Sequence, residues 1–161
     1  MKINKYHTRH PEKEITDHSE ILRIVKSQKF MTIAMSKDNE PYLITVNYAF
    51  DEGKNRFYFH CSKTGKKADF IHSNTKVWGQ ILEDKGYLIG QCDHAYCSVH
   101  FTGLAEFIDD ENEKRRALDL LIEQLEPNPL PVKERFLKQV KLDSVGVVRI
   151  KVTQWSGKVN S

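Results

Sequence analysis

The chain has 161 residues, of which 39 % are hydrophobic and 29 % charged, as in ordinary globular proteins with one sizeable core. Its net charge of +3 is mild and its basic residues are scattered, which argues against a nucleic-acid-binding protein. No apolar run approaches the roughly 18 residues of a membrane span, and the polar segment 1–15 lacks the apolar core of a signal peptide. We therefore expect one cytoplasmic domain over residues 1–161 that binds neither nucleic acid nor membrane, with 1–15 as a possible N-terminal arm. Three cysteines cannot all pair, so reduced thiols are expected.

The first periodic segment after the arm predicts a helix. Asp17 and Glu20 have the spacing of a capping box, and an apolar stripe follows them on one face: Ile21, Leu22, Ile24 and Val25. Alternating patterns then predict six strands, at residues 30–36, 41–50, 56–61, 76–82, 96–108 and 144–153. Asp38 and Asn39 form the first turn, residues 51–55 a hairpin loop, and residues 83–93 a long loop.

Three more helices are expected between the strands. A short one spans about 64–72, and a longer one is capped by Asp110 and Glu113 and ended by Pro127, Pro129 and Pro131. A last short helix covers about 132–140. Helices inserted between hairpins do not give a regular βαβ alternation, so the predicted fold is mainly β, an antiparallel barrel with peripheral helices.

The stretch His60-Cys61-Ser62-Lys63-Thr64-Gly65-Lys66-Lys67 carries the clearest chemical signal. A strand ends here, a hydroxyl-rich turn follows, and a helix opens with two lysines in its first turn. Helix N-termini favour anions, and lysines placed there suggest an anionic group that offsets them. The stretch is not a Walker A loop, because His60 stands where its first glycine should be. A phosphate site and a merely solvated helix start both fit the spacing.

At this point the chain resembles a known family. The segment PYLITVNYAFDEGKNRFYFHCSKTGKKADFIHSNTKV is similar to the nitroimidazole-resistance (Nim-like) branch of the pyridoxamine 5'-phosphate oxidase superfamily, in which "YFH" is followed by "GKK" and a helix ending in Asn. The later YCSVHFTGLAEFIDDENEKRRALDLL resembles the family's "Y-R-S-V…G-x-A" strand and its acidic, capped helix. The likeness covers residues 14 to 158 and rests on the order and spacing of motifs. It implies a split β-barrel that holds FMN between the two subunits of a homodimer.

The resemblance also implies roles for individual residues. Thr45, Val46, Asn47 and Tyr48 would lie along the flavin, while His60 and Cys61 would lie beside its ribityl chain and phosphate. Lys66 and Lys67 match the basic pair that grips the phosphate, and Ser62 would add a hydroxyl donor. The remaining candidates for cofactor contacts are Gln80, Ser98 and Trp155. For His60 a structural role, satisfied by a backbone carbonyl, is equally open, and Trp155 could instead be a packing residue.

Two departures from the family pattern bear on function. Where relatives often read Tyr-Arg-Ser-Val, this chain has Cys97 in place of the Arg, which puts the contact of that Arg in doubt. The C-terminal Gln154-Trp155-Ser156-Gly157-Lys158 also lacks the Arg-x-His element that holds pyridoxamine phosphate in the true oxidases, which argues against that substrate.

A zinc site would need Cys92, His94, Cys97 and His100 to converge. Cys97 and His100 should point to opposite faces of one strand, so no metal site is expected. The leading functional hypothesis is an FMN-dependent oxidoreductase that takes electrons, as from a reduced nicotinamide, and passes them to a small aromatic, nitro or quinone-like acceptor. The alternative is a protein that binds or stores a flavin or haem without turnover. No side chain is assigned as a catalytic acid or base.

Overall fold

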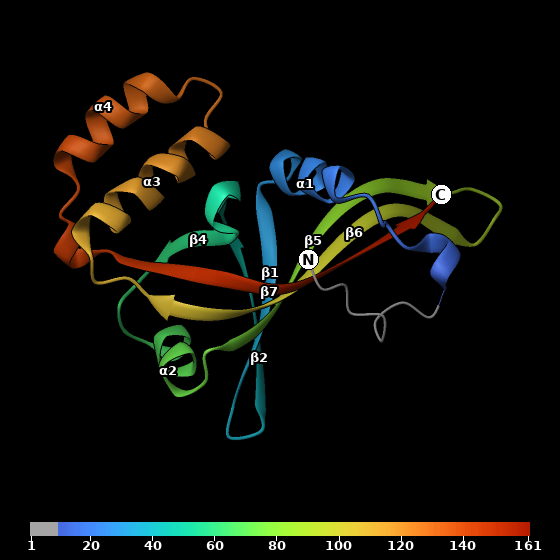
Figure 1. The fold of residues 1–161 in the computed structure, drawn as a ribbon, viewed down its shortest axis with the longest axis horizontal. Coiled ribbons are helices and arrows are strands. Elements are labelled where there is room, and N and C mark those ends of the chain that lie inside the picture. Colours follow the sequence, from blue (N-terminus) through green and yellow to red (C-terminus); the bar gives the residue numbers. More distant parts are fainter. Residues whose placement is uncertain (1–9) are drawn as a thin grey trace.

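The computed structural model describes residues 10–161 as one seven-stranded antiparallel sheet with helices around it (Figure 1). The strands are β1 (Phe30–Lys37), β2 (Glu40–Asn47), β3 (Ala49–Asp51), β4 (Arg56–Cys61), β5 (Lys76–Leu88), β6 (Asp93–Phe107) and β7 (Gly146–Asn160). The α-helices are α1 (His18–Ser27), α2 (Lys66–Ser73), α3 (Glu111–Leu125) and α4 (Pro129–Gln139). The expected class, mainly β with peripheral helices, is confirmed.

The predicted strand 41–50 becomes two strands that close the barrel. The sheet order is β2-β1-β5-β6-β7-β4-β3, so β2 and β3 lie at its two ends. Yet only Tyr48 separates β2 from β3 along the chain, and the sheet is therefore closed through the covalent backbone. Tyr48 is fully buried, and its hydroxyl donates to the carbonyl of Val25 at 2.6 Å, which ties this bend to α1. The chain pairs with β1 before the bend and with β4 after it, giving a split barrel.

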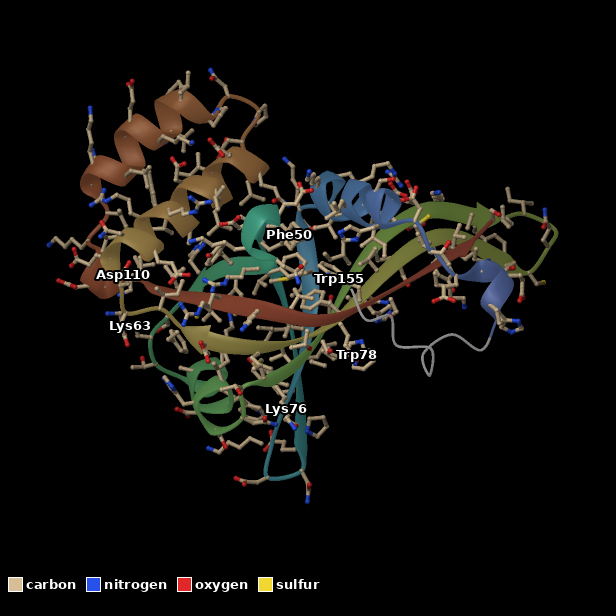
Figure 2. The ribbon with its side chains drawn as sticks, in the orientation of Figure 1. Phe50, Lys63, Lys76, Trp78, Asp110 and Trp155 are labelled. Atoms are coloured by element: carbon tan, nitrogen blue, oxygen red, sulfur yellow. The ribbon has the colours of Figure 1, made fainter. Side chains whose placement is uncertain are left out.

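The barrel interior is filled by aromatic rings. Phe57 and Phe101 stack with centroids 4.4 Å apart, and Trp155 meets both rings at 5.7–5.8 Å. Figure 2 shows Trp155 beside Phe50, whose ring centroid lies 5.7 Å away. Such contacts combine a large buried area with favourable edge and stacking geometry, so these strands form the main core.

Helices α1, α2 and α3 pack against the strands of the barrel. Ile21, Ile24 and Val25 of α1 are fully buried in the main core. A second core lies where α3 packs on β3 and β4, and α4 packs on α3 (Figure 1). The predicted N-cap residues of α1 and α3 are confirmed: Asp17 accepts from the Ser19 amide at 2.9 Å, and Asp110 from the Glu113 amide at 2.7 Å. The carboxylates of Glu20 and Glu113, predicted to complete the two caps, instead accept hydrogen bonds from arginine side chains. None of the helices within residues 10–161 is both long and apolar enough to cross a membrane.

Two predicted boundaries were wrong. The segment 83–93 is largely strand: β5 continues to Leu88, and β6 begins at Asp93. A register shift between Asp84 and Tyr87, with Gly86 at φ 95°, interrupts the alternation that the prediction relied on. The last strand likewise runs to Asn160 instead of stopping at 153, past a register shift between Thr102 and Gly103 of its partner β6.

The described part of the expected arm is attached to the barrel. Residues 1–9 lie outside the described structure. Pro11–Lys13 form a single 3₁₀ turn, Glu14 bridges to Lys158, and the Ile15 amide donates to the Gly157 carbonyl at 2.9 Å. Ile15 is buried, so the chain joins the core packing beside β7 at this residue.

Candidate flavin site

The turn between β4 and α2 has the features expected of an anion site. The Ser62 hydroxyl accepts from the Thr64 amide at 3.2 Å, and Gly65 adopts a φ of 101°, which favours glycine. Helix α2 then begins at Lys66, and no side chain caps its first turn. The unpaired amides of that turn are therefore open to an anionic ligand.

The two lysines of the turn have different surroundings. The Lys66 ammonium lies 2.6 Å from Glu40, with both side chains more than half exposed, and 4.9 Å from the Tyr42 ring centroid. An exposed pair of this kind contributes little free energy, so it leaves Lys66 available to a stronger anion. The Lys67 ammonium lies 5.9 Å from the Phe59 ring centroid. Burial raises the pKa of the nearby Cys61 thiol, and the Lys67 charge acts in the opposite direction.

Four of the predicted residues share the outer face of the sheet. Thr45 pairs with Thr32 across β2 and β1, and Thr32 pairs with Gln80 on β5. With strands about 4.8 Å apart, Thr45 and Gln80 lie about 10 Å from each other across Thr32. Asn47 and Ser98 lie two residues further along β2 and β6, in the neighbouring row. The sheet thus gathers side chains that are far apart in the sequence.

Three predicted residues face the barrel interior instead. Val46 alternates with Thr45 and packs against the main core, and Tyr48 is fully buried. Trp155 is 2 % exposed, and its indole N–H donates to Asn55 at 3.3 Å. A side chain buried to this extent packs in the barrel core, and a contact between Trp155 and the cofactor stays a prediction.

His60 lies on the opposite face of β4 from its neighbours. Phe59 is buried in the barrel, whereas His60 is exposed and lines a cavity of about 340 Å³ with Leu121, Phe136 and other side chains of α3 and α4. Lys67 approaches the Phe59 face, so the structure does not bring His60 and Lys67 together on one side of the strand.

A chain of contacts links that cavity to the end of β2. The Asn47 amide donates to the Lys29 carbonyl at 3.0 Å, and the Lys29 ammonium donates to the carbonyl of Leu125 at 2.8 Å. Leu125 lines the cavity with His60. Asn47 is therefore connected, through Lys29, to one of the residues that line the cavity beside His60.

A second cavity, of about 470 Å³, opens on the outer face. Its lining includes the predicted Gln80 and Ser98, together with Tyr96, His100 and Lys158. None of the last three was predicted to contact a cofactor, and His100 was considered only as a zinc ligand, because only the register of β5, β6 and β7 brings them together. Thr32, which joins Thr45 to Gln80, was missed for the same reason.

The side chains considered for zinc do not converge. Cys97 is buried in the main core, while His100 lines the outer cavity, and the His94 ring instead pairs with Asp84 at 2.6 Å. Within residues 10–161 no group of three or more His, Cys, Asp or Glu side chains is arranged to hold a metal ion.

Known proteins are similar to this chain in sequence or in structure. A UPF0306 protein of Pasteurella multocida is 26 % identical over 102 residues, which are 63 % of this chain and 65 % of that protein's length. A candidate 5-nitroimidazole antibiotic resistance protein from Bacteroides thetaiotaomicron superimposes with a TM-score of 0.76 and 22 % identity, covering 91 % of this chain and 86 % of the other.

Two further solved structures are described by their cofactors. An FAD-binding protein of Mesorhizobium loti has a TM-score of 0.65 and 22 % identity, covering 90 % of this chain and 96 % of the other. An FAD- and haem-binding protein of Mycobacterium smegmatis has a TM-score of 0.78 and 15 % identity, covering 92 % and 74 %. At these identities the likeness establishes the fold.

The family itself follows from the sequence match. The pyridoxamine 5'-phosphate oxidase family matches residues 17–159. This span includes all four α-helices and every strand, except for the last residue of β7. This chain belongs to the pyridoxamine 5'-phosphate oxidase family.

Proposed function

We propose that this protein binds FMN between two copies of the chain and uses it to reduce a small aromatic, nitro or quinone-like acceptor. The observation that carries the proposal is the shared outer face of Thr45, Asn47, Gln80 and Ser98, four polar residues from three strands. A planar ligand with polar edges fits such a face. The names of the similar structures, which include flavin-binding proteins, point to the same class of ligand.

The residues of the β4–α2 turn fit the phosphate of FMN. Lys66 and Lys67 supply two positive charges, Ser62 a hydroxyl, and the uncapped start of α2 a set of free amides. A phosphate would replace the exposed Glu40 as the partner of Lys66, and exchanging a weak surface pair for a charge-assisted contact is favourable.

A second copy of the chain would cover the outer face. Phe30, Leu43 and Leu82 point outward from β1, β2 and β5 and are 61 %, 64 % and 49 % exposed. Large apolar side chains gathered on one face mark an interaction surface, and a homodimer would join identical faces around a twofold axis. Gln80 and Ser98 of one copy would then meet a flavin whose phosphate is held by α2 of the other.

The side chains of this protein would bind and orient, while bound FMN would supply hydride and electron transfer. Lys66, Lys67 and Ser62 would hold the phosphate, Thr45 and Asn47 the polar edge of the ring, and the apolar outer face would exclude water. Oxidation of pyridoxamine phosphate is not part of the proposal, because the chain lacks the Arg-x-His element at Gln154–Ser156.

An absorbance spectrum of the purified protein tests the proposal. We expect a flavin spectrum that bleaches anaerobically on addition of a reduced nicotinamide and returns with a quinone or a nitroaromatic compound. A protein that binds no added FMN contradicts the proposal.

A binding protein without turnover is the second candidate. It is favoured by the cavity of about 340 Å³ beside His60 and by a similar structure named for both FAD and haem. A stable flavin or haem spectrum that no reduced nicotinamide bleaches would select this candidate over the reductase.

A further inference from the structure

Three side chains of the outer face form a short relay. The indole N–H of Trp78 on β5 donates to Nδ1 of His100 on β6 at 3.0 Å. The amide nitrogen of Gln80, two residues further along β5, lies 3.3 Å from Nε2 of the same imidazole. Gln80 is the register partner of His100, so the strand pairing itself holds the relay in place.

The hydrogen bond from Trp78 determines which ring nitrogen of His100 carries the proton. The indole nitrogen only donates hydrogen bonds, so Nδ1 of His100 must accept and cannot carry a proton. A neutral imidazole has one proton, which therefore sits on Nε2. A doubly protonated ring would turn an N–H of His100 against the N–H of Trp78, and the hydrogen bond would be lost.

His100 in turn fixes the orientation of the Gln80 amide. An Nε2–H group cannot pair with an amide N–H, because both are donors. The two ends of an amide have nearly the same shape, and their orientation is set by the hydrogen-bond network. The consistent network turns Oε1 of Gln80 toward His100 and leaves the amide NH₂ for a group in the outer cavity, which both residues line.

The rest of this cavity wall also favours acceptors. Ser98 adds a hydroxyl, and the Lys158 ammonium lies over the Tyr96 ring, 5.6 Å from its centroid. Lys158 has no carboxylate within ion-pair distance among residues 10–161. The one carboxylate of the wall, Asp84, is already paired with His94 at 2.6 Å.

We propose that His100 is a positioning residue that makes Gln80 a hydrogen-bond donor, and that the wall formed by Gln80, Ser98 and Lys158 recognises carbonyl or carboxylate oxygens of a planar ligand. This inference rests on the proposed function only in that a bound flavin would be one source of such oxygens. The other source is a carbonyl- or carboxylate-bearing acceptor molecule.

The relay is tested by the ¹⁵N NMR signals of the His100 ring in the full-length protein. We expect a protonated Nε2 and an unprotonated Nδ1, and a mixture of both tautomers in Trp78→Phe. A protonated Nδ1 in the wild type overturns the relay, whether or not the protein binds FMN. The proposed function and this inference can therefore fail separately.

The donor wall is tested with two probes, riboflavin and benzoate. Gln80→Glu keeps an oxygen for His100 but replaces the NH₂ donor with a negative charge. We expect it to weaken binding of at least one probe roughly tenfold or more, the cost of one lost hydrogen bond beside an added charge. His100→Phe should weaken the same probe by less, since Gln80 keeps its amide but loses its orientation.

Thr102→Val is the matched control, because Thr102 lies two residues from His100 on the same face and its hydroxyl bonds to Thr153 instead. A loss confined to riboflavin assigns the wall to the flavin carbonyls, and a loss confined to benzoate assigns it to the acceptor. Either result, or both, supports the inference. Unchanged affinities in Gln80→Glu, or a wild type that binds neither probe, overturn it.

Discussion

At the scale of single residues, the phosphate grip depends on Lys66 and Lys67. If both contact the phosphate, Lys66→Ala/Lys67→Ala should weaken FMN binding by several kcal/mol, since each charge-assisted hydrogen bond contributes about 1.5–3 kcal/mol. Riboflavin lacks the phosphate and should bind both proteins equally. Fluorescence titration measures both affinities.

Lys26→Ala is the control for a lost surface charge. Lys26 forms an exposed pair with Glu52 at 2.6 Å, which matches the pair of Lys66 with Glu40. It should bind FMN as the wild type does. An unchanged FMN affinity in the double variant would contradict the assignment of the phosphate site to this turn.

Cys61 reports on the same turn through its reactivity. Burial raises the pKa of this thiol, and the positive charge of Lys67 lowers it in part. Because the thiolate is the reactive form, alkylation of Cys61 should begin only at a pH above that of an ordinary free thiol. Lys67→Ala should move the onset to still higher pH, and mass spectrometry of alkylated peptides would follow it. An onset that Lys67→Ala leaves unchanged would place the lysine charge away from Cys61.

At the scale of elements, the ring of Phe101 can lie over β5 only because residue 79 is a glycine. A Cβ built on Gly79 would lie 2.0 Å from the ring of Phe101, which stacks on Phe57 in the barrel. Gly79→Ala must displace that ring, and we expect a loss of about 1–3 kcal/mol in the free energy of unfolding. Gly53→Ala is the control, since its nearest neighbour would be 3.7 Å away. Equal denaturation midpoints for the two variants would contradict this account of the core.

The ion pair between Arg23 of α1 and Glu83 of β5 should make the stability of the fold depend on pH. Arg23 donates two hydrogen bonds to Glu83, at 2.8 and 2.9 Å, and these lower the pKa of Glu83 below its ordinary 4.5. A lowered folded-state pKa stabilises the fold at neutral pH, and the contribution is lost as pH falls through that value.

Glu83→Gln should therefore reduce stability by about 0.5–1 kcal/mol at about pH 7, and the difference from the wild type should shrink as the pH falls through the lowered pKa of Glu83. Urea unfolding at a series of pH values measures it. A difference in unfolding free energy that persists in acid would show that the substitution acts through packing and not through the charge of Glu83.

The elements also show where sequence reasoning succeeds and where it stops. Helix caps are local, so Asp17 and Asp110 could be identified from spacing alone. The strand alternation separated Thr45 from Val46 only after the sheet faces were known. The bulge beyond Asp84 concealed the second half of β5, and with it the role of Glu83. The relay of Trp78, Gln80 and His100 depends on the register in which β5 pairs with β6. This register could not be predicted from the sequence alone.

At the scale of the whole molecule, the account requires two copies. The outer face presents Leu43 and Phe30 to solvent beside the residues proposed to hold the flavin, and we propose that the same face of a second copy covers them. The two halves of the proposed site, at α2 and at the outer cavity, then act on one ligand from opposite subunits.

The most direct test is sedimentation of the protein with FMN, followed by the visible absorbance of the flavin. We predict that the flavin sediments with a species of roughly twice the 18.8 kDa chain mass. Leu43→Glu should shift both protein and flavin toward slower species, whereas Ile89→Glu, in an exposed turn of the β5–β6 hairpin, should not. Flavin that sediments with a monomer, or that stays free at saturating protein, would contradict the account.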